Sequence, residues 1–185
     1  MDDLQAIHRL KRGEIGGLEV LVARYQTGAI ETAFLITQDP ALAEDVVQDV
    51  FVNLYRRVRH YDANRPFKPY LMKSVVNAAL DAVEKEAKWV HSAMDEDTSD
   101  LEELISHAAS VEDQVEFAQL REAIDIALAA LPARQRAAIV QRYYLNMSEK
   151  EMAQALEAAP GTVKWLLNTA RTRLHTLLGS ERSEE

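Results

Sequence analysis

The chain has 185 residues, and its 30 acidic against 21 basic side chains give a formal net charge of −9, which opposes nucleic-acid binding unless the charges are segregated along the chain. It has no cysteine, which excludes disulfides, thiolate zinc sites and thiol nucleophiles and fits a reducing compartment. The acidic N-terminus lacks the apolar core of a signal peptide and no charge-free run approaches the ~18 residues of a membrane span, so we expect a soluble, cytoplasmic protein of one domain or two small ones, without membrane association.

The N-terminal part of the chain is predicted to be helical. In its first stretch apolar side chains recur at helical steps of three and four, at Leu18, Leu21, Val22 and Tyr25. Gly28 is expected to bend or end that helix. Asp39 and Pro40 form a strong helix start, with the aspartate as N-cap and the proline at the first helical position.

The helix that begins there has two distinct sides. One side carries an apolar stripe at every fourth position, Leu42, Val46, Val50, Leu54 and Val58, flanked by Val47 and Phe51. The other side is polar, with Glu44, Asp45, Gln48, Asp49, Asn53, Arg56 and Arg57. On pattern alone this second side is either a solvated surface or an interface.

A break at residues 61–66 is followed by a further helix or pair of helices from Phe67 to Trp89. No alternating strand pattern occurs, so the fold class is predicted to be all-α.

An acidic segment separates this part from the C-terminal part. Residues 90–118 hold nine acidic side chains and no lysine or arginine. Such a block buries too little apolar surface to pack as a core, so we expect a flexible linker over 91–118 between helical domains at 1–90 and 119–180. Residues 90–118 alone contribute a charge of −9, equal to the net charge of the whole chain, and residues 119–179 are locally basic, with eight basic and five acidic residues.

A helix-turn-helix is predicted in the basic domain. Ser148 and Glu151 form a capping box at the start of the first helix. The second helix starts near Gly161 and runs to Leu178 with positive but no negative charge, which favours a surface that faces phosphates. An ordinary helical hairpin with a solvated basic face remains the alternative.

Three stretches, in this order, resemble one family. Residues 43–51 (AEDVVQDVF), residues 66–71 (PFKPYL) leading to Val76 and Asn77, and Leu131-Pro132 with residues 160–164 (PGTVK) are similar to conserved regions 2 and 4 of bacterial extracytoplasmic-function sigma factors of the sigma-70 family. The resemblance covers roughly residues 5–89 and 119–178. It implies a protein that binds core RNA polymerase and promoter DNA, with an anti-sigma factor as a further partner.

The resemblance also implies roles for particular residues. In the family the helix over 43–57 docks on a coiled coil of the polymerase clamp, which makes its polar side an interface candidate: Asp45, Gln48, Asp49, Asn53, Arg56 and Arg57. The segment 67–89 opens DNA at the −10 element, where Asn77 occupies the position that captures a flipped base, Lys68 and Lys73 hold phosphates, and Phe67 begins the segment. The residues that the resemblance implies for binding the −35 element are Thr162, Lys164, Trp165, Asn168, Arg171 and Arg173.

The −35 helix departs from the family pattern. Trp165, Leu166 and Thr169 stand where serine and arginines are usual, so the cations are expected to anchor the DNA backbone while base recognition is altered. Trp165 and Leu166 then contact bases through apolar groups, or they form a contact for a protein partner. Glu157 also replaces the usual glycine of the turn.

No catalytic constellation is evident, because the five histidines are scattered and no nucleophile or phosphate-loop motif occurs. We therefore expect a sigma factor that is not an enzyme and uses no cofactor or metal. The alternatives are a sigma-like interaction protein that binds an anti-sigma factor or polymerase without recognising DNA, and a stand-alone helix-turn-helix regulator.

Overall fold

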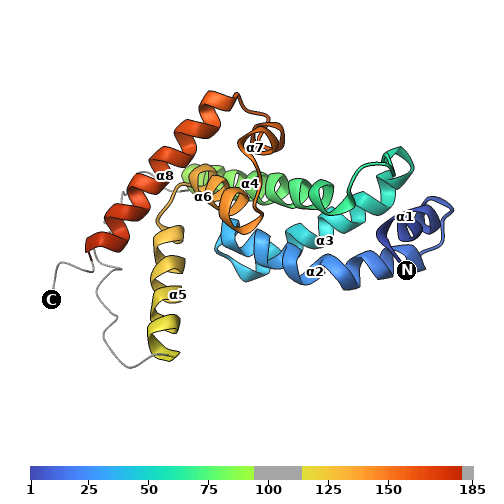
Figure 1. Ribbon diagram of the computed structural model, residues 1–185, viewed down its shortest axis with the longest axis horizontal. Coiled ribbons are helices and arrows are strands. Elements are labelled where there is room, and N and C mark those ends of the chain that lie inside the picture. Colours follow the sequence, from blue (N-terminus) through green and yellow to red (C-terminus); the bar gives the residue numbers. More distant parts are fainter. Residues whose placement is uncertain (94–113, 181–185) are drawn as a thin grey trace. The chain divides into compact units, whose positions relative to one another are not determined.

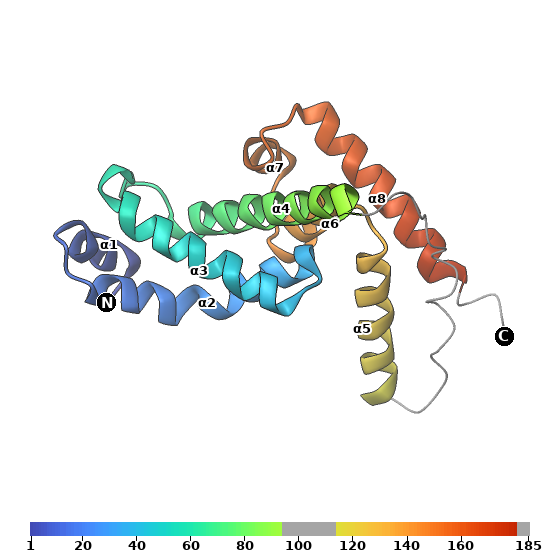
Figure 2. The ribbon, with the colours of Figure 1, turned by 180° about the vertical axis from the view of Figure 1, so that it is seen from behind.

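The computed structural model of the protein describes residues 1–93 and 114–180 (Figures 1 and 2). They contain α-helices and helical turns and no β-strand, which confirms the all-α fold class. The chain divides into two compact units, Met1–Glu84 and Lys85–Glu185. Most of the predicted linker, residues 94–113, lies outside the described residues. Its described ends, residues 91–93 and 114–118, belong to helices. Within the described chain no helix is both long and apolar enough to cross a bilayer.

The first unit is built from four helices and one helical turn. They are α1 (Asp3–Lys11), α2 (Gly16–Thr37), α3 (Pro40–Arg57), a 3₁₀ turn (Val58–His60) and α4 (Phe67–Ala93), whose last part extends past this unit. In both views α2 and α3 run side by side in opposite directions, joined by a two-residue turn (Figures 1 and 2).

The helix starts of this unit follow from local sequence. The side chain of Asp39 accepts a hydrogen bond from the backbone N–H of Leu42 at 3.0 Å, and Pro40 occupies the first turn, which confirms the predicted start of α3. Asp2 and Gln5 form a capping box that starts α1. Of the bend or end predicted at Gly28, the end is wrong, because α2 continues through this residue to Thr37. A single glycine costs a helix only about 1 kcal/mol, which the packing of α2 on its neighbours outweighs.

The core of the first unit combines the predicted stripe of α3 with apolar side chains of α4. Val46, Val50, Leu54 and Val58 are buried and Leu42 is half-buried, so the stripe is confirmed. The buried residues of α4 are Phe67, Leu71, Met72, Val75, Val76, Ala79 and Leu80. Helix α1 crosses α2 at Gly17, where a Cβ atom would lie 2.3 Å from the carbonyl oxygen of Ala6. Glycine therefore permits the close approach of the two backbones.

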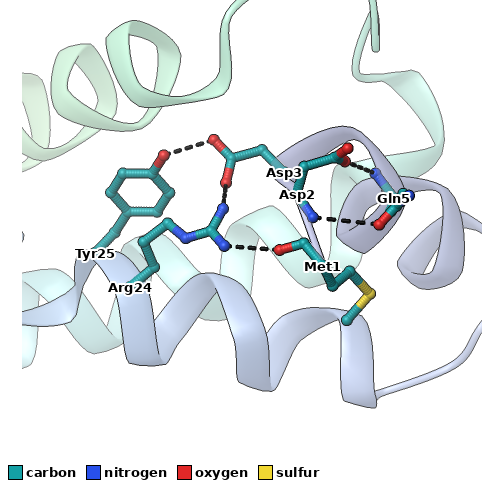
Figure 3. Close-up of polar contacts among 6 residues, drawn as sticks. All are labelled: Met1, Asp2, Asp3, Gln5, Arg24 and Tyr25. Carbon is teal, nitrogen blue, oxygen red and sulfur yellow. Dashed lines mark hydrogen bonds and ion pairs between the residues drawn. The ribbon is translucent and has the colours of Figure 1, made fainter.

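A polar cluster ties the start of α1 to α2 (Figure 3). The carboxylate of Asp3 pairs with Arg24 and accepts a hydrogen bond from the Tyr25 hydroxyl at 2.5 Å. Arg24 also donates to the carbonyl of Met1 at 2.7 Å. Burial, and then the bond to Asp3, raise the pKa of Tyr25 to about 12. The phenol therefore stays neutral well above its ordinary range.

The second unit contains α5 (Gln114–Ala129), α6 (Ala133–Ile139), a π-helical turn (Val140–Tyr144), α7 (Glu149–Ala155) and α8 (Pro160–Ser180). Both α6 and α7 pack on α8. Their shared core is apolar and includes Leu128, Leu131, Ala137, Ile139, Val140, Met152, Val163, Leu166, Leu167 and Ala170.

One charged side chain is buried among these helices. Arg136 is only 6 % exposed, and its terminal nitrogen donates to the carbonyls of Leu128 at 3.4 Å and Ala129 at 3.2 Å. These carbonyls belong to the last turn of α5, where backbone acceptors lack partners within the helix. Burial lowers the pKa of Arg136 from its usual value. The side chain thus caps one helix from the next.

Candidate functional site

The polar side of α3 is fully displayed to solvent. All six side chains proposed to bind polymerase are exposed, and none forms an ion pair with another described residue: Asp45, Gln48, Asp49, Asn53, Arg56 and Arg57. Helical geometry places the first five along one side of α3, whereas Arg57 lies toward its edge. The structure therefore brings five of the six predicted residues together on one surface.

Two apolar side chains of this surface were missed by the sequence analysis. Val52 is 43 % exposed and Tyr55 is 45 % exposed. Val52 lies one turn after Gln48 and one turn before Arg56, so it sits within the polar stripe. The sequence could have identified them as exposed, because neither residue belongs to the apolar stripe at every fourth position of α3. Tyrosine is enriched in protein interfaces, and the exposed valine adds apolar area beside it.

Phe67 does not belong to a DNA-contacting surface. Its side chain is 3 % exposed, and its ring packs 5.5 Å from that of Tyr25, 6.1 Å from that of Tyr61 and 6.5 Å from that of Tyr70. The prediction that Phe67 takes part in DNA binding is corrected accordingly, because this aromatic cluster seats the first turn of α4 on the rest of the unit. The ring's partners are Tyr61 and Tyr70, which are near in the sequence, and Tyr25 of α2, which only the fold brings close.

The remaining −10 candidates lie on two sides of α4. Lys73 and Asn77 are both half-buried and stand one turn apart on the same side, whereas exposed Lys68 lies well around the helix from them. Tyr70 shares the side of Asn77 and is 38 % exposed, and its ring centroid lies 4.7 Å from that of Tyr61, with the two rings tilted by 53°. An exposed ring beside an amide gives a surface on which a base can stack and be hydrogen-bonded. Sequence analysis did not single out Tyr70.

The capping box predicted at the start of α7 is confirmed. The Ser148 hydroxyl accepts from the backbone N–H of Glu151 at 3.3 Å, and the Glu151 carboxylate accepts from the backbone N–H of Ser148 at 2.8 Å. A further bond from the Ser148 hydroxyl to the same carboxylate, at 2.6 Å, contributes most to holding the pKa of Glu151 below its usual value. The capping box therefore fixes where α7 begins.

In the turn between α7 and α8, Glu157 stands where the resemblance to the family implies a glycine. Glu157 has a φ of 49°, in the left-handed region that glycine favours. The N–H of Ala158 bonds to the carbonyl of Ala153 at 3.0 Å, the pattern of a Schellman helix end. Glutamate is accepted at this position, but with a conformational cost of about 1–2 kcal/mol.

All six −35 candidates on α8 are exposed, but they do not share one side. Helical geometry puts Lys164, Asn168 and Arg171 in a single stripe, with Trp165 next to it, whereas Thr162 and Arg173 lie about half a turn away. Trp165 is 59 % exposed. The positive charges of α8 are therefore split between two sides of the helix.

Leu166 is part of the core and not of this surface. Its side chain is 5 % exposed, so the expectation that Trp165 and Leu166 act as an exposed apolar pair is wrong for the leucine. Leu166 shares the inward side of α8 with Val163, Leu167 and Ala170. A residue that sequence analysis missed, Tyr143, instead contacts the exposed stripe, through a hydrogen bond with Arg171.

Two known protein families match parts of the chain. The family described as Sigma-70 region 2 matches residues 21–89, and the one described as Sigma-70, region 4 matches residues 121–174, so the two models together match more than half of the chain. The chain is 25 % identical to the ECF RNA polymerase sigma factor SigW of Bacillus subtilis, over 93 % of this chain and 94 % of that protein.

Two solved structures have a similar fold. One is CnrH in complex with the cytosolic domain of CnrY, with a TM-score of 0.65 and 21 % identity over 96 % of this chain and 97 % of the other. The second is the sigma factor RpoE in complex with the anti-sigma factor NepR from Bartonella quintana, with a TM-score of 0.63 and 21 % identity over 90 % and 98 % of the two chains.

Proposed function

Because the chain belongs to the sigma-70 family and resembles its extracytoplasmic-function members along nearly its whole length, we propose that its two helical units divide the work of promoter recognition between them. As a sigma factor it binds core RNA polymerase and directs promoter recognition and transcription initiation. We assign polymerase binding and −10 melting to residues 1–90, −35 binding to residues 119–180, and the connection to residues 91–118. Sigma factors are initiation factors, so the chain itself is proposed to carry no catalytic step and to act in the cytoplasm, where polymerase is.

The exposed side of α3 is the proposed polymerase surface. Its support is the set of unpaired charges around Val52, together with the burial of the opposite side, which leaves this surface without a structural task inside the unit. Charges of both signs select a complementary partner, and the exposed valine and tyrosine supply apolar area to its centre. An anti-sigma factor is a second proposed partner, in line with the RpoE–NepR complex among the structural neighbours.

Charge reversal tests this surface. We expect Asp49→Arg with Arg56→Glu to abolish binding of core polymerase, with little change in melting temperature, because exposed substitutions usually alter stability by only about 0.5 kcal/mol. The matched control reverses one charge of each sign elsewhere, in Glu19→Arg with Arg121→Glu, both also at exposed sites. Wild-type core binding by the α3 variant in a pull-down would refute the assignment.

The −10 contact is proposed at Asn77, supported by Tyr70. The amide of Asn77 can both donate to and accept from a base edge, and the half-exposed ring of Tyr70 offers a stacking surface on the same side of α4. Asn77→Ala should therefore impair open-complex formation more than closed-complex binding. Permanganate footprinting measures the melted bases, and wild-type melting by the variant would remove Asn77 from this role.

The −35 contact is proposed for the stripe of α8 formed by Lys164, Asn168 and Arg171, with Trp165 beside it. Cations anchor phosphates, an amide can bind a base edge, and an exposed indole can contact a thymine methyl. Selection of duplexes by the holoenzyme from a library randomised over the upstream element is the test. A pool without enrichment would refute sequence-specific −35 recognition.

The 59 % exposure of Trp165 also favours a second candidate, an interaction protein that binds polymerase or an anti-sigma factor without recognising DNA. Run-off transcription with core polymerase separates the two functions. A transcript that depends on the added chain supports the sigma factor. Stable polymerase binding without any transcript supports the interaction protein, and DNA binding by residues 119–180 without either supports a stand-alone regulator.

A further inference from the structure

Tyr143 lies outside α8 but is bonded to the side of α8 that we assign to DNA. It belongs to the π-helical turn Val140–Tyr144, and its side chain is 60 % exposed. The hydroxyl oxygen of Tyr143 accepts a hydrogen bond from Nε of Arg171 at 2.9 Å. A tyrosine so exposed is not needed to fill the core, so its effect is to be sought on the surface it shares with Arg171.

The contact fixes the guanidinium through a hydrogen bond. The guanidinium carbon of Arg171 lies 5.8 Å from the centre of the Tyr143 ring, near the ~6 Å limit for a cation–π contact. On the other side, one terminal nitrogen of Arg171 lies 3.5 Å from Oδ1 of Asn168, which is a long bond. These contacts leave most of the guanidinium N–H donors available to another partner, because arginine carries several in a rigid fork.

The backbone that carries Tyr143 is itself well anchored. Val140 and Gln141, at the start of the π-helical turn, are fully buried. The carbonyl of Gln141 accepts from the N–H of Met147 at 2.9 Å, and the side chain of Arg142 donates to the carbonyl of Met147 at 2.9 Å. The hydroxyl of Tyr143 is thus presented to α8 from a fixed support.

We propose that Tyr143 is a positioning residue that holds Arg171 ready to bind a phosphate of promoter DNA. The inference rests on the proposed function of α8 as the DNA-facing helix. An arginine on an exposed helix loses rotamer freedom when it binds, and a side chain oriented beforehand loses less. The Tyr143 oxygen can orient it because a phenol accepts as well as donates. Lys164, in the same stripe, has no equivalent support among the contacts described.

Tyr143→Phe is the decisive variant, because it removes the hydroxyl and keeps the ring. Holoenzyme is reconstituted from the full chain and core polymerase. Its affinity is measured for duplexes that the wild-type holoenzyme selects from the library randomised over the upstream element, with the unselected pool as reference. We expect Tyr143→Phe to weaken binding by about 3- to 10-fold, the worth of one ordinary hydrogen bond. In a chain that already carries Arg171→Ala the same change should cost less than about 2-fold, because its target is gone.

A matched pair of variants tests the DNA face independently. Arg171→Ala should lower the slope of log affinity against log salt by about 0.9, whereas Arg173→Ala, with the same charge change about half a turn away, should leave it unchanged. If Arg171→Ala weakens binding and Tyr143→Phe does not, the positioning role is refuted and the DNA face stands. If Arg173→Ala weakens binding and Arg171→Ala does not, the assignment of the DNA face to the side of Arg171 is wrong, and the positioning role of Tyr143 is refuted as well.

A third outcome bears on Tyr143 alone. A loss of affinity by Tyr143→Phe that persists undiminished in the Arg171→Ala background would show that the hydroxyl acts by another route, and would overturn the proposal. Melting temperature is followed in parallel. Because the side chain is mostly exposed, Tyr143→Phe should leave it unchanged, and a purely structural role would instead lower the melting temperature without coupling to Arg171.

Discussion

The crossing of α1 and α2 gives a pair of substitutions with opposite expected effects, Gly17→Ala and Gly28→Ala. A Cβ at Gly17 would lie 2.3 Å from the carbonyl oxygen of Ala6 and 2.9 Å from the backbone nitrogen of Leu10. Both atoms are backbone, so neither can rotate away and α1 must shift. At Gly28, in the same helix, nothing lies within 4 Å of the added carbon.

The magnitudes follow from these two environments. Overpacking costs about 1–3 kcal/mol and partial undocking of α1 adds exposure of Ile7 and Leu10, so a net loss of roughly 2 kcal/mol remains for Gly17→Ala after the gain of about 0.5–1 kcal/mol from helix propensity. For a unit of this size that lowers the melting temperature by roughly 10 °C. Gly28→Ala should instead raise it by about 4 °C, because only the propensity gain applies.

Thermal unfolding followed by circular dichroism measures both variants, and hydrogen exchange locates the change. Faster exchange at the amides of α1 is expected for Gly17→Ala, with exchange in the second unit unaffected. If Gly17→Ala were as stable as the wild type, the close approach at the crossing would be refuted. If Gly28→Ala were also destabilised, glycine would be needed along α2 for a reason other than space.

Three further sets of substitutions are informative. Glu157→Gly should raise the stability of the second unit by about 0.5–1 kcal/mol, because glycine removes the strain of the left-handed backbone; Glu157→Ala keeps that strain, and an equal gain from it would point to charge instead. Trp165→Ala should alter −35 selection and leave the melting temperature unchanged, whereas Leu166→Ala should destabilise the unit by about 2–5 kcal/mol, so equal stabilities would contradict the burial of Leu166. Tyr25→Phe tests the polar cluster through pH. With its pKa raised to about 12, Tyr25 contributes stability that is complete below pH ~10 and is lost as pH rises through about 12. The difference in melting temperature between wild type and Tyr25→Phe should therefore shrink over that range, and a constant difference would argue against the raised pKa.

Features set by neighbours in the sequence were predicted well. The capping box of Ser148 and Glu151, the start of α3 at Asp39 and the buried stripe from Val46 to Val58 all depend on residues within one or two helical turns. Their physical cause, capping of the first turn and burial of one side of a helix, can be recognised from spacing alone. Gly28 shows the limit of local reasoning, because its low helix propensity suggested that the helix could end there, whereas α2 continues through it.

Features set by distant residues were not predictable in this way. Phe67 was assigned to DNA because it begins a motif, but its ring packs against Tyr25 of α2, which only the fold brings close, as well as against its sequence neighbours Tyr61 and Tyr70. Leu166 is similar, since its side of α8 becomes inward only once α6 and α7 pack there. The hydrogen bond between Tyr143 and Arg171 joins two helical elements, and the spacing of these residues in the sequence does not predict it.

The buried guanidinium of Arg136 couples the end of α5 to α6, so these two segments should change together in evolution. Its donors serve carbonyls in the last turn of α5, at Leu128 and Ala129, while its own backbone belongs to α6. A neutral side chain at this position would remove this donor from the carbonyl of Ala129 and leave the carbonyl of Leu128 with the N–H of Leu131 alone, at 3.1 Å, which is costly unless the end of α5 changes with it. Among near relatives, substitutions at position 136 should therefore accompany rearrangement of the α5–α6 junction, whereas an exposed site such as Leu120 is free to drift alone.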